Sequence, residues 1–222
     1  GRVVQTFEDV ISRDFPESLF QASLKGSSIY QKAVPLRPGL YKLDIVLKDI
    51  QSGNVGVVNT RLAVPRYEPE KLTASTLIIA DQIERVPARQ VGLGQFVLGA
   101  SKVRPKLDRE FTTAEKLGIF LQIYGLSIDP KTHKTDATVE YRVKRGQEQV
   151  FAQTESSAEL QQTGEQLTIE KLMTLSTFPP GKYRIEIVVT DRLSGQTLNP
   201  AAEFTVKAAA DAKTAAQLSH GR

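Results

Sequence analysis

The sequence predicts an all-β protein of two tandem immunoglobulin-like antiparallel β-sandwiches, of the fibronectin type III kind, with the first one truncated. Three observations lead to this prediction: short segments with every second residue apolar, intervening turns rich in Asp, Gly, Pro and Ser, and an internal repeat. With 222 residues, of which 40% are hydrophobic, the chain has enough apolar material for two ordinary cores.

An ungapped internal match at an offset of 142 residues aligns residues 36–64 with residues 178–206. Nine of the 29 aligned positions are identical, and most other positions of the first strand are chemically similar. We predict a structural motif in each copy, formed by Pro38, Gly39, Tyr41, Asp49 and Gly53 and by Pro180, Gly181, Tyr183, Asp191 and Gly195.

Each copy of the repeat has the pattern of a β-hairpin. Apolar and polar residues alternate over residues 41–48 and 183–190, as in a half-buried strand. In the Asp-x-x-Ser-Gly turn that follows, Asp accepts local backbone N–H bonds and Gly takes a positive φ. The preceding Pro-Gly-x-Tyr resembles the tyrosine corner of immunoglobulin-like sandwiches, so each hairpin is expected to end a sandwich. Tyr41 and Tyr183 are expected to be equally and largely buried, each with its hydroxyl bonded to a backbone group.

Further β-rich runs fill the rest of the chain. The first unit has candidate strands at residues 3–8, 18–23 and 28–34. The second has them at residues 76–80, 95–98, 117–126, 137–145, 149–154 and 166–175, the last of which also fits a short helix.

These runs set the domain boundaries. We assign residues 1–66 to the first sandwich module, 67–73 to a linker, 74–207 to the second module and 208–222 to a flexible Ala-rich tail. The first module has five candidate strands, whereas a complete sandwich has about seven in roughly 100 residues. It is therefore expected to begin upstream of Gly1 or to borrow a strand, and truncation is the favoured explanation.

Composition argues against several classes of function. The chain has no Cys and only two His, so it lacks the residues for a disulfide scaffold, a thiol nucleophile or a multi-His metal centre. The Gly92-Leu-Gly94 segment does not complete a dinucleotide-binding motif. We predict no catalytic residues, no cofactor, no metal and no enzymatic activity, and no apolar run is long enough to span a membrane.

Two polar segments allow alternative interpretations. Residues 129–136 contain two Asp and one His; the segment fits an exposed turn better than a divalent-cation site. The densest basic run is either a solvated segment or a contact for an anionic partner, and it consists of Lys102, Arg104, Lys106 and Arg109. Because the net charge of +4 is spread along the chain, no nucleic-acid partner is expected.

The motif Leu-x-Pro-Gly-x-Tyr from Leu36 onward and the segments 77–81, 104–111 and 117–124 resemble a known region. They are similar to the carboxy-terminal β-sandwich region of bacterial GWxTD-domain proteins and of the VWFA-related proteins of the same, largely acidobacterial, families. The resemblance implies a sandwich fold and a periplasmic or other extracytoplasmic location in the cell envelope. It implies no catalytic residues.

The sequence therefore favours a non-catalytic structural or interaction module of a bacterial cell-envelope protein. Its expected partners are another protein or other domains of the same longer chain. Two alternatives stay open: a β-sandwich that binds a glycan or peptide, and a pair of accessory domains of an enzyme whose catalytic domain lies upstream. Three or more aromatic rings exposed on one face would favour the ligand-binding alternative.

Overall fold

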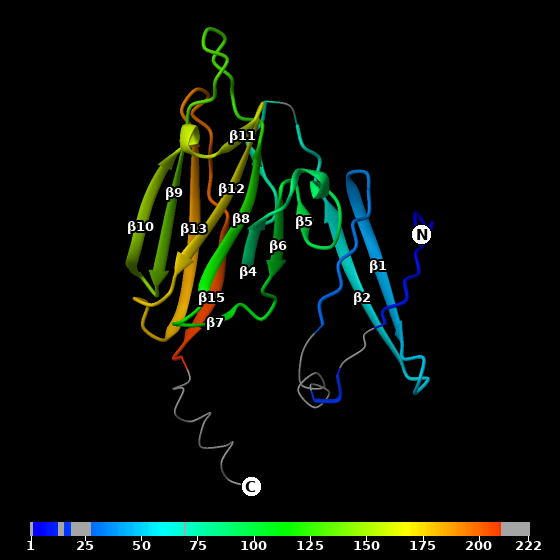
Figure 1. Cartoon of the computed structure of the whole chain (residues 1–222). Coiled ribbons are helices and arrows are strands. Elements are labelled where there is room, and N and C mark those ends of the chain that lie inside the picture. Colours follow the sequence, from blue (N-terminus) through cyan, green and yellow to red (C-terminus); the bar gives the residue numbers. More distant parts are fainter. Residues whose placement is uncertain (1, 13–15, 19–27, 69, 210–222) are drawn as a thin grey trace. The chain divides into compact units, whose positions relative to one another are not determined.

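The computed structural model describes residues 2–12, 16–18, 28–68 and 70–209 (Figure 1). Contacts between residues divide the chain into two units, Gly1–Val34 and Pro35–Arg222. The described residues confirm the predicted all-β class, because antiparallel sheets form sandwich layers. Helical residues are confined, in the described part, to residues 17–18 and two short 3-10 turns, η1 (Ala88–Gln90) and η2 (Ser157–Glu159). The predicted tail lies outside the described residues from residue 210 on.

The described residues of the unit Gly1–Val34 form no strand. Predicted strands at residues 3–8 and 28–34 are therefore wrong in this structure, and most of the predicted strand at 18–23 lies outside the described residues. A β-strand needs a neighbour for its backbone hydrogen bonds, and no described segment of this unit pairs with another. Contacts here are between side chains: Asp9 accepts hydrogen bonds from Tyr30 and, at 2.7 Å, from Lys32.

The first copy of the repeat is a two-stranded sheet. Strand β1 (Gly39–Lys48) pairs antiparallel with β2 (Val55–Val64) over ten residue pairs, from Gly39 opposite Val64 to Lys48 opposite Val55. The second copy keeps this register, since Tyr41 is opposite Leu62 and Tyr183 is opposite Phe204. In the second copy Pro200 divides the return strand in two, because proline has no N–H for the ladder.

The strands of the predicted second module form a sandwich of two sheets, here called the second sandwich. The order in the first sheet is β10 (Glu148–Ser156), β9 (Ala137–Arg145), β13 (Gly181–Asp191), β15 (Ala201–Lys207) and β7 (Glu110–Thr112), with β14 (Thr197–Leu198) beside β13. The order in the other sheet is β11 (Gln161–Thr163), β12 (Gln166–Thr174), β8 (Lys116–Tyr124), β4 (Ile78–Arg85), β6 (Ser101–Pro105) and β5 (Val97–Leu98), with β3 (Thr73–Ala74) beside β8.

This pairing order is that of an immunoglobulin-like domain. The sequence β11-β12-β8-β4 corresponds to strands D-E-B-A, and β9-β13-β15 corresponds to C-F-G. All pairs are antiparallel except β15 with β7. The predicted strand at residues 137–145 matches β9 residue for residue, and residues 166–174 form strand β12 rather than the alternative helix.

One continuous core lies between the two sheets. Its fully buried side chains come from both layers and include Ile119 and Leu121 of β8 and Ile185 and Ile187 of β13. A second, smaller cluster of Ala80, Val103 and Phe120 covers the other side of β8, so this strand is buried on both faces. Gly118 is required in β8, since a Cβ there would lie 2.9 Å from the Ala80 carbonyl oxygen.

Both copies of the repeat contain the predicted tyrosine corner. The Tyr183 hydroxyl donates to the Pro179 carbonyl at 2.5 Å, and the Tyr41 hydroxyl donates to the Arg37 carbonyl at 2.6 Å. Both acceptors lie four residues upstream. The two rings differ in burial, however, because Tyr183 stacks on Phe204 in the core and is 2% exposed, whereas Tyr41 is only half-buried. Equal burial of the two rings was expected from the repeat, and that expectation fails.

This difference predicts unequal costs for the same substitution. Tyr183→Ala removes a large aromatic side chain from a packed core and should lower the free energy of unfolding by about 3–5 kcal/mol. Tyr41→Ala should lower it much less, since its ring already contacts water. Chemical denaturation of both variants tests this, and equal losses would contradict it.

Candidate functional site

The hairpin turns of the two copies have the same hydrogen bonds. The Asp49 carboxylate accepts the Gln51 N–H at 3.0 Å and the Ser52 hydroxyl, and the Gly53 N–H reaches the Asp49 carbonyl at 2.8 Å. Asp191 makes the corresponding bonds to Leu193, Ser194 and Gly195. Gly53 and Gly195 both have a φ of 74°, which a side chain would disfavour.

The Asp129 segment is a third turn of this kind. The Asp129 carboxylate accepts the N–H groups of Lys131 and Thr132, each at 2.8 Å, and the His133 N–H reaches the Asp129 carbonyl at 2.8 Å. His133 stands where the other turns have Gly and has a φ of 54°. Asp129 thus serves as a turn cap, and no three His, Asp or Glu of the described residues are grouped to hold a metal.

The hairpin of β1 and β2 has one apolar and one mixed face. Residues directly opposite each other in an antiparallel pair lie on the same face. The register therefore gives one face, here called the inner face, the apolar side chains Tyr41, Leu43, Ile45, Leu47, Val58 and Leu62, with the polar Thr60 opposite Leu43. The centre of the other face is polar, with Lys42 3.0 Å from Asp44 and Asp44 also bonded to Asn59.

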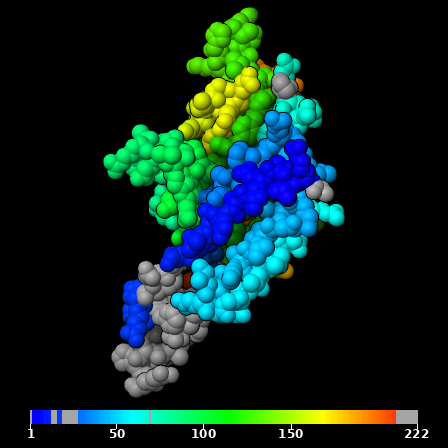
Figure 2. Space-filling model, turned by 90° about the vertical axis from the view of Figure 1, so that its right-hand side faces the viewer, coloured from blue at the N-terminus to red at the C-terminus, as the bar shows by residue number. Residues whose placement is uncertain are grey.

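The inner face is open over much of its length. Exposed fractions are 39% for Ile45, 61% for Leu47 and 54% for Val58. Figure 2 draws the atoms of the hairpin in light blue to cyan. In the second copy Ile187 and Val189, which correspond to Ile45 and Leu47, are fully buried. The same alternating sequence is therefore covered in one copy and uncovered in the other.

The structure gives two of the four cations in the basic run an acidic partner. The run consists of Lys102, Arg104, Lys106 and Arg109. Arg104 lies 2.6 Å from Asp81, and Lys106 lies 3.0 Å from Glu115 and 5.2 Å from the ring centre of Phe111. Two of the four cations are thus neutralised within the chain, and binding of an anionic partner stays a prediction.

A buried tyrosine, Tyr141 of β9, links the two sheets of the sandwich through Glu155 of β10 and Lys171 of β12. The fully buried Tyr141 donates to Glu155 at 2.8 Å. Lys171 of β12 pairs with Glu155 and lies 4.5 Å from the centre of the Tyr141 ring. Burial, and then the bond to Glu155, raise the pKa of Tyr141, so the phenol keeps its proton. The cluster anchors β9, β10 and β12 to one another, and the residue spacing in the sequence does not reveal it.

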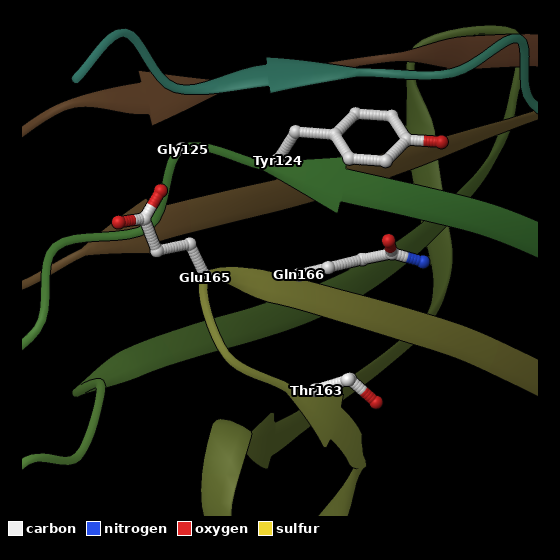
Figure 3. A pocket seen from close by; sticks show the side chains of 5 residues that line it. All are labelled: Tyr124, Gly125, Thr163, Glu165 and Gln166. Carbon is white, nitrogen blue, oxygen red and sulfur yellow. The ribbon is translucent and has the colours of Figure 1, made fainter. Parts of the chain in front are cut away.

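The hollows of the sandwich are shallow. One, of about 260 Å³, lies at one end of β8 and β12. Figure 3 shows Tyr124 and Gln166 on neighbouring strands, with Thr163 beyond them. Another, of about 510 Å³, lies beside Glu155, Glu159 and Lys171. Neither hollow is lined by apolar side chains converging on a few polar groups, the arrangement usual in small-molecule sites.

No protein-family model matches this sequence, and no curated protein matches it. The resemblance to GWxTD-domain proteins therefore stays a prediction. Among the described residues, no helix combines the length and the apolar character needed to cross a membrane. The uncovered hairpin is the feature of the structure that most needs a functional explanation.

The two turn aspartates differ in burial, since Asp191 is buried and Asp49 is exposed. The environment of Asp191 predicts that the stability of the fold depends on pH. Burial raises the pKa of Asp191, but hydrogen bonds from Ser194, Ser127 and Leu193 outweigh it and hold the pKa below its usual value. A pKa lowered by folding stabilises the fold at pH values above the unfolded pKa of about 3.9, and this contribution is lost as pH falls below it.

Asp191→Asn should therefore lower the free energy of unfolding by about 1–3 kcal/mol at pH 7. The difference from the natural chain should shrink as pH falls below about 4, and it should vanish below the pKa of Asp191 in the folded chain, which lies lower still. Asp49→Asn, which changes the exposed copy of the same turn, is the matched control and should have little effect. Denaturation curves between pH 3 and pH 7 test this, and a pH-independent loss would contradict it.

Proposed function

We propose that this chain is a non-catalytic interaction module of a bacterial cell-envelope protein, and that the inner face of the β1–β2 hairpin is its surface for protein–protein contact. The observation that supports the proposal most strongly is the exposure of Ile45, Leu47 and Val58 on one face of a regular hairpin. Contiguous exposed apolar side chains on a soluble protein are typical of interaction sites.

Residues outside the hairpin also favour a protein-interaction function over a catalytic or ligand-binding one. The candidate metal segment around Asp129 is a capped turn, and the Tyr141–Glu155–Lys171 cluster ties strands together. The glycan- or peptide-binding alternative needs aromatic rings gathered on one face. In the described part of residues 35–222 only Tyr67 is exposed, and its ring packs on Tyr124 at 5.2 Å. Location in the envelope rests on the family resemblance alone.

Site-specific photocross-linking tests the proposal. The full chain is exported to the envelope of a bacterial host with a photoreactive amino acid in place of Leu47. We expect discrete protein adducts, because partners that cover the inner face come within reach of this position. Adding Ile45→Lys should reduce their yield about tenfold, since a charge in a dry interface costs more than 1.4 kcal/mol.

The matched control carries the photoreactive amino acid at Leu172, which is 46% exposed on β12 of the second sandwich. Leu172 has an exposure comparable to that of Leu47, but it does not belong to the inner face of the hairpin. An adduct pattern that is the same at both positions, or that Ile45→Lys leaves unchanged, would overturn the proposed function.

A further inference from the structure

The second copy of the repeat shows what a complete hairpin contacts. Strand β13 lies between two strands, β15 on one side and β9 on the other. Its antiparallel register with β9 places Ile187 opposite Tyr141 and Glu186 opposite Arg142. In the described residues β1 has a neighbour on one side alone, namely β2. The other edge of β1 therefore presents a row of backbone N–H and C=O groups without strand partners.

The charges on the outer side of β1 also lack their counterpart. In the second copy Glu186 lies 3.1 Å from Arg184 of its own strand and 2.9 Å from Lys144 of β9. Asp44 and Lys42 take the places of Glu186 and Arg184, and they form their own ion pair at 3.0 Å. The Asp44 side chain is 50% exposed against 11% for Glu186, and among the described residues no strand supplies Asp44 with a counterpart of Lys144.

The turn aspartates of the two copies also differ in one hydrogen bond. Asp191 accepts, besides the bonds of its own turn, the Ser127 N–H at 3.0 Å from the loop after β8. Asp49 accepts bonds from its own turn, and no described residue outside that turn donates to its carboxylate. The edge, the turn and the charge positions of the hairpin thus match those of the second copy, but within the described part of residues 35–222 no second strand pairs with β1.

We propose that the free edge of β1 binds an antiparallel β-strand of another protein chain, and that this strand has the chemistry of β9. It carries apolar side chains at alternate positions, directed to the inner face, and Lys or Arg opposite Asp44. Main-chain hydrogen bonds along residues 42–49 supply affinity, and the alternating side chains set the register. The inference rests on the proposed function, because it names the partner of the same surface.

The absence of Cys from the chain permits a direct test by disulfide trapping. The full chain with Ile45→Cys is mixed with a synthetic nine-residue peptide of the β9 sequence, residues 137–145, in a glutathione redox buffer. One peptide carries Cys at the position of Tyr141, which the register places opposite residue 45. Opposite residues of an antiparallel pair have Cα atoms about 4.5–5.5 Å apart, within the range of a disulfide.

The matched control peptide carries Cys at the position of Arg142, one residue away and therefore on the opposite face of the added strand. We expect the mixed disulfide with the first peptide to exceed that with the control about tenfold, and the unmodified peptide to compete with it. Equal yields with the two peptides would overturn the proposal. So would a disulfide-linked homodimer as the sole product, since the occupant would then be a second copy of this chain.

The two proposals fail in different ways. If Leu47 gives envelope adducts but the β9 peptides show no register preference, the strand proposal is wrong and the interaction function stands. If Leu47 gives no adducts above the Leu172 control, the interaction function itself is wrong.

Discussion

A β-ribbon of two strands has two edges and two faces, and water competes for all of them unless other elements cover them. Strand β13 is covered on both edges, by β9 and by β15, and the facing sheet buries its side chains Ile185, Ile187 and Val189. Strand β1 has a similar pattern of apolar and polar residues, but among the described residues it has a strand neighbour on one edge alone. Isolated two-stranded hairpins are marginally stable in water. The proposed interaction function and the proposed added strand both rest on this unequal cover.

The local geometry of the hairpin nevertheless forms without that cover. The register, the turn hydrogen bonds, the φ angle of the turn glycine and the tyrosine–carbonyl bond agree between the two copies, although one is buried and the other exposed. These features depend on residues close together in the chain, namely Asp49, Gly53 and Tyr41 in the first copy. Because the hairpin is already shaped, an added strand would not have to pay for ordering it.

Features that depend on local sequence were predicted well. Strand β9 and both hairpins, the Asp–Gly turns and the tyrosine corners follow from alternation and turn residues. The predicted strands at residues 3–8 and 28–34 failed because a β-rich pattern does not say whether a pairing partner exists. Exposure of Ile45 and Leu47 was not predictable either, since alternation shows which face is apolar but not whether it is covered. The Tyr141–Glu155–Lys171 cluster joins residues from three strands, and no local spacing signals it.

Hydrogen exchange of the full chain, in dilute monomeric solution, tests the central claim that the first hairpin lacks its cover. The informative comparison is between the amides of residues 43–48 and those of residues 185–190, which are aligned by the repeat and have the same local geometry. Our account predicts that β1 amides exchange by local opening, much faster than β13 amides, which exchange by global unfolding. Equal protection of the two segments would contradict it, because the first hairpin would then be as well covered as the second.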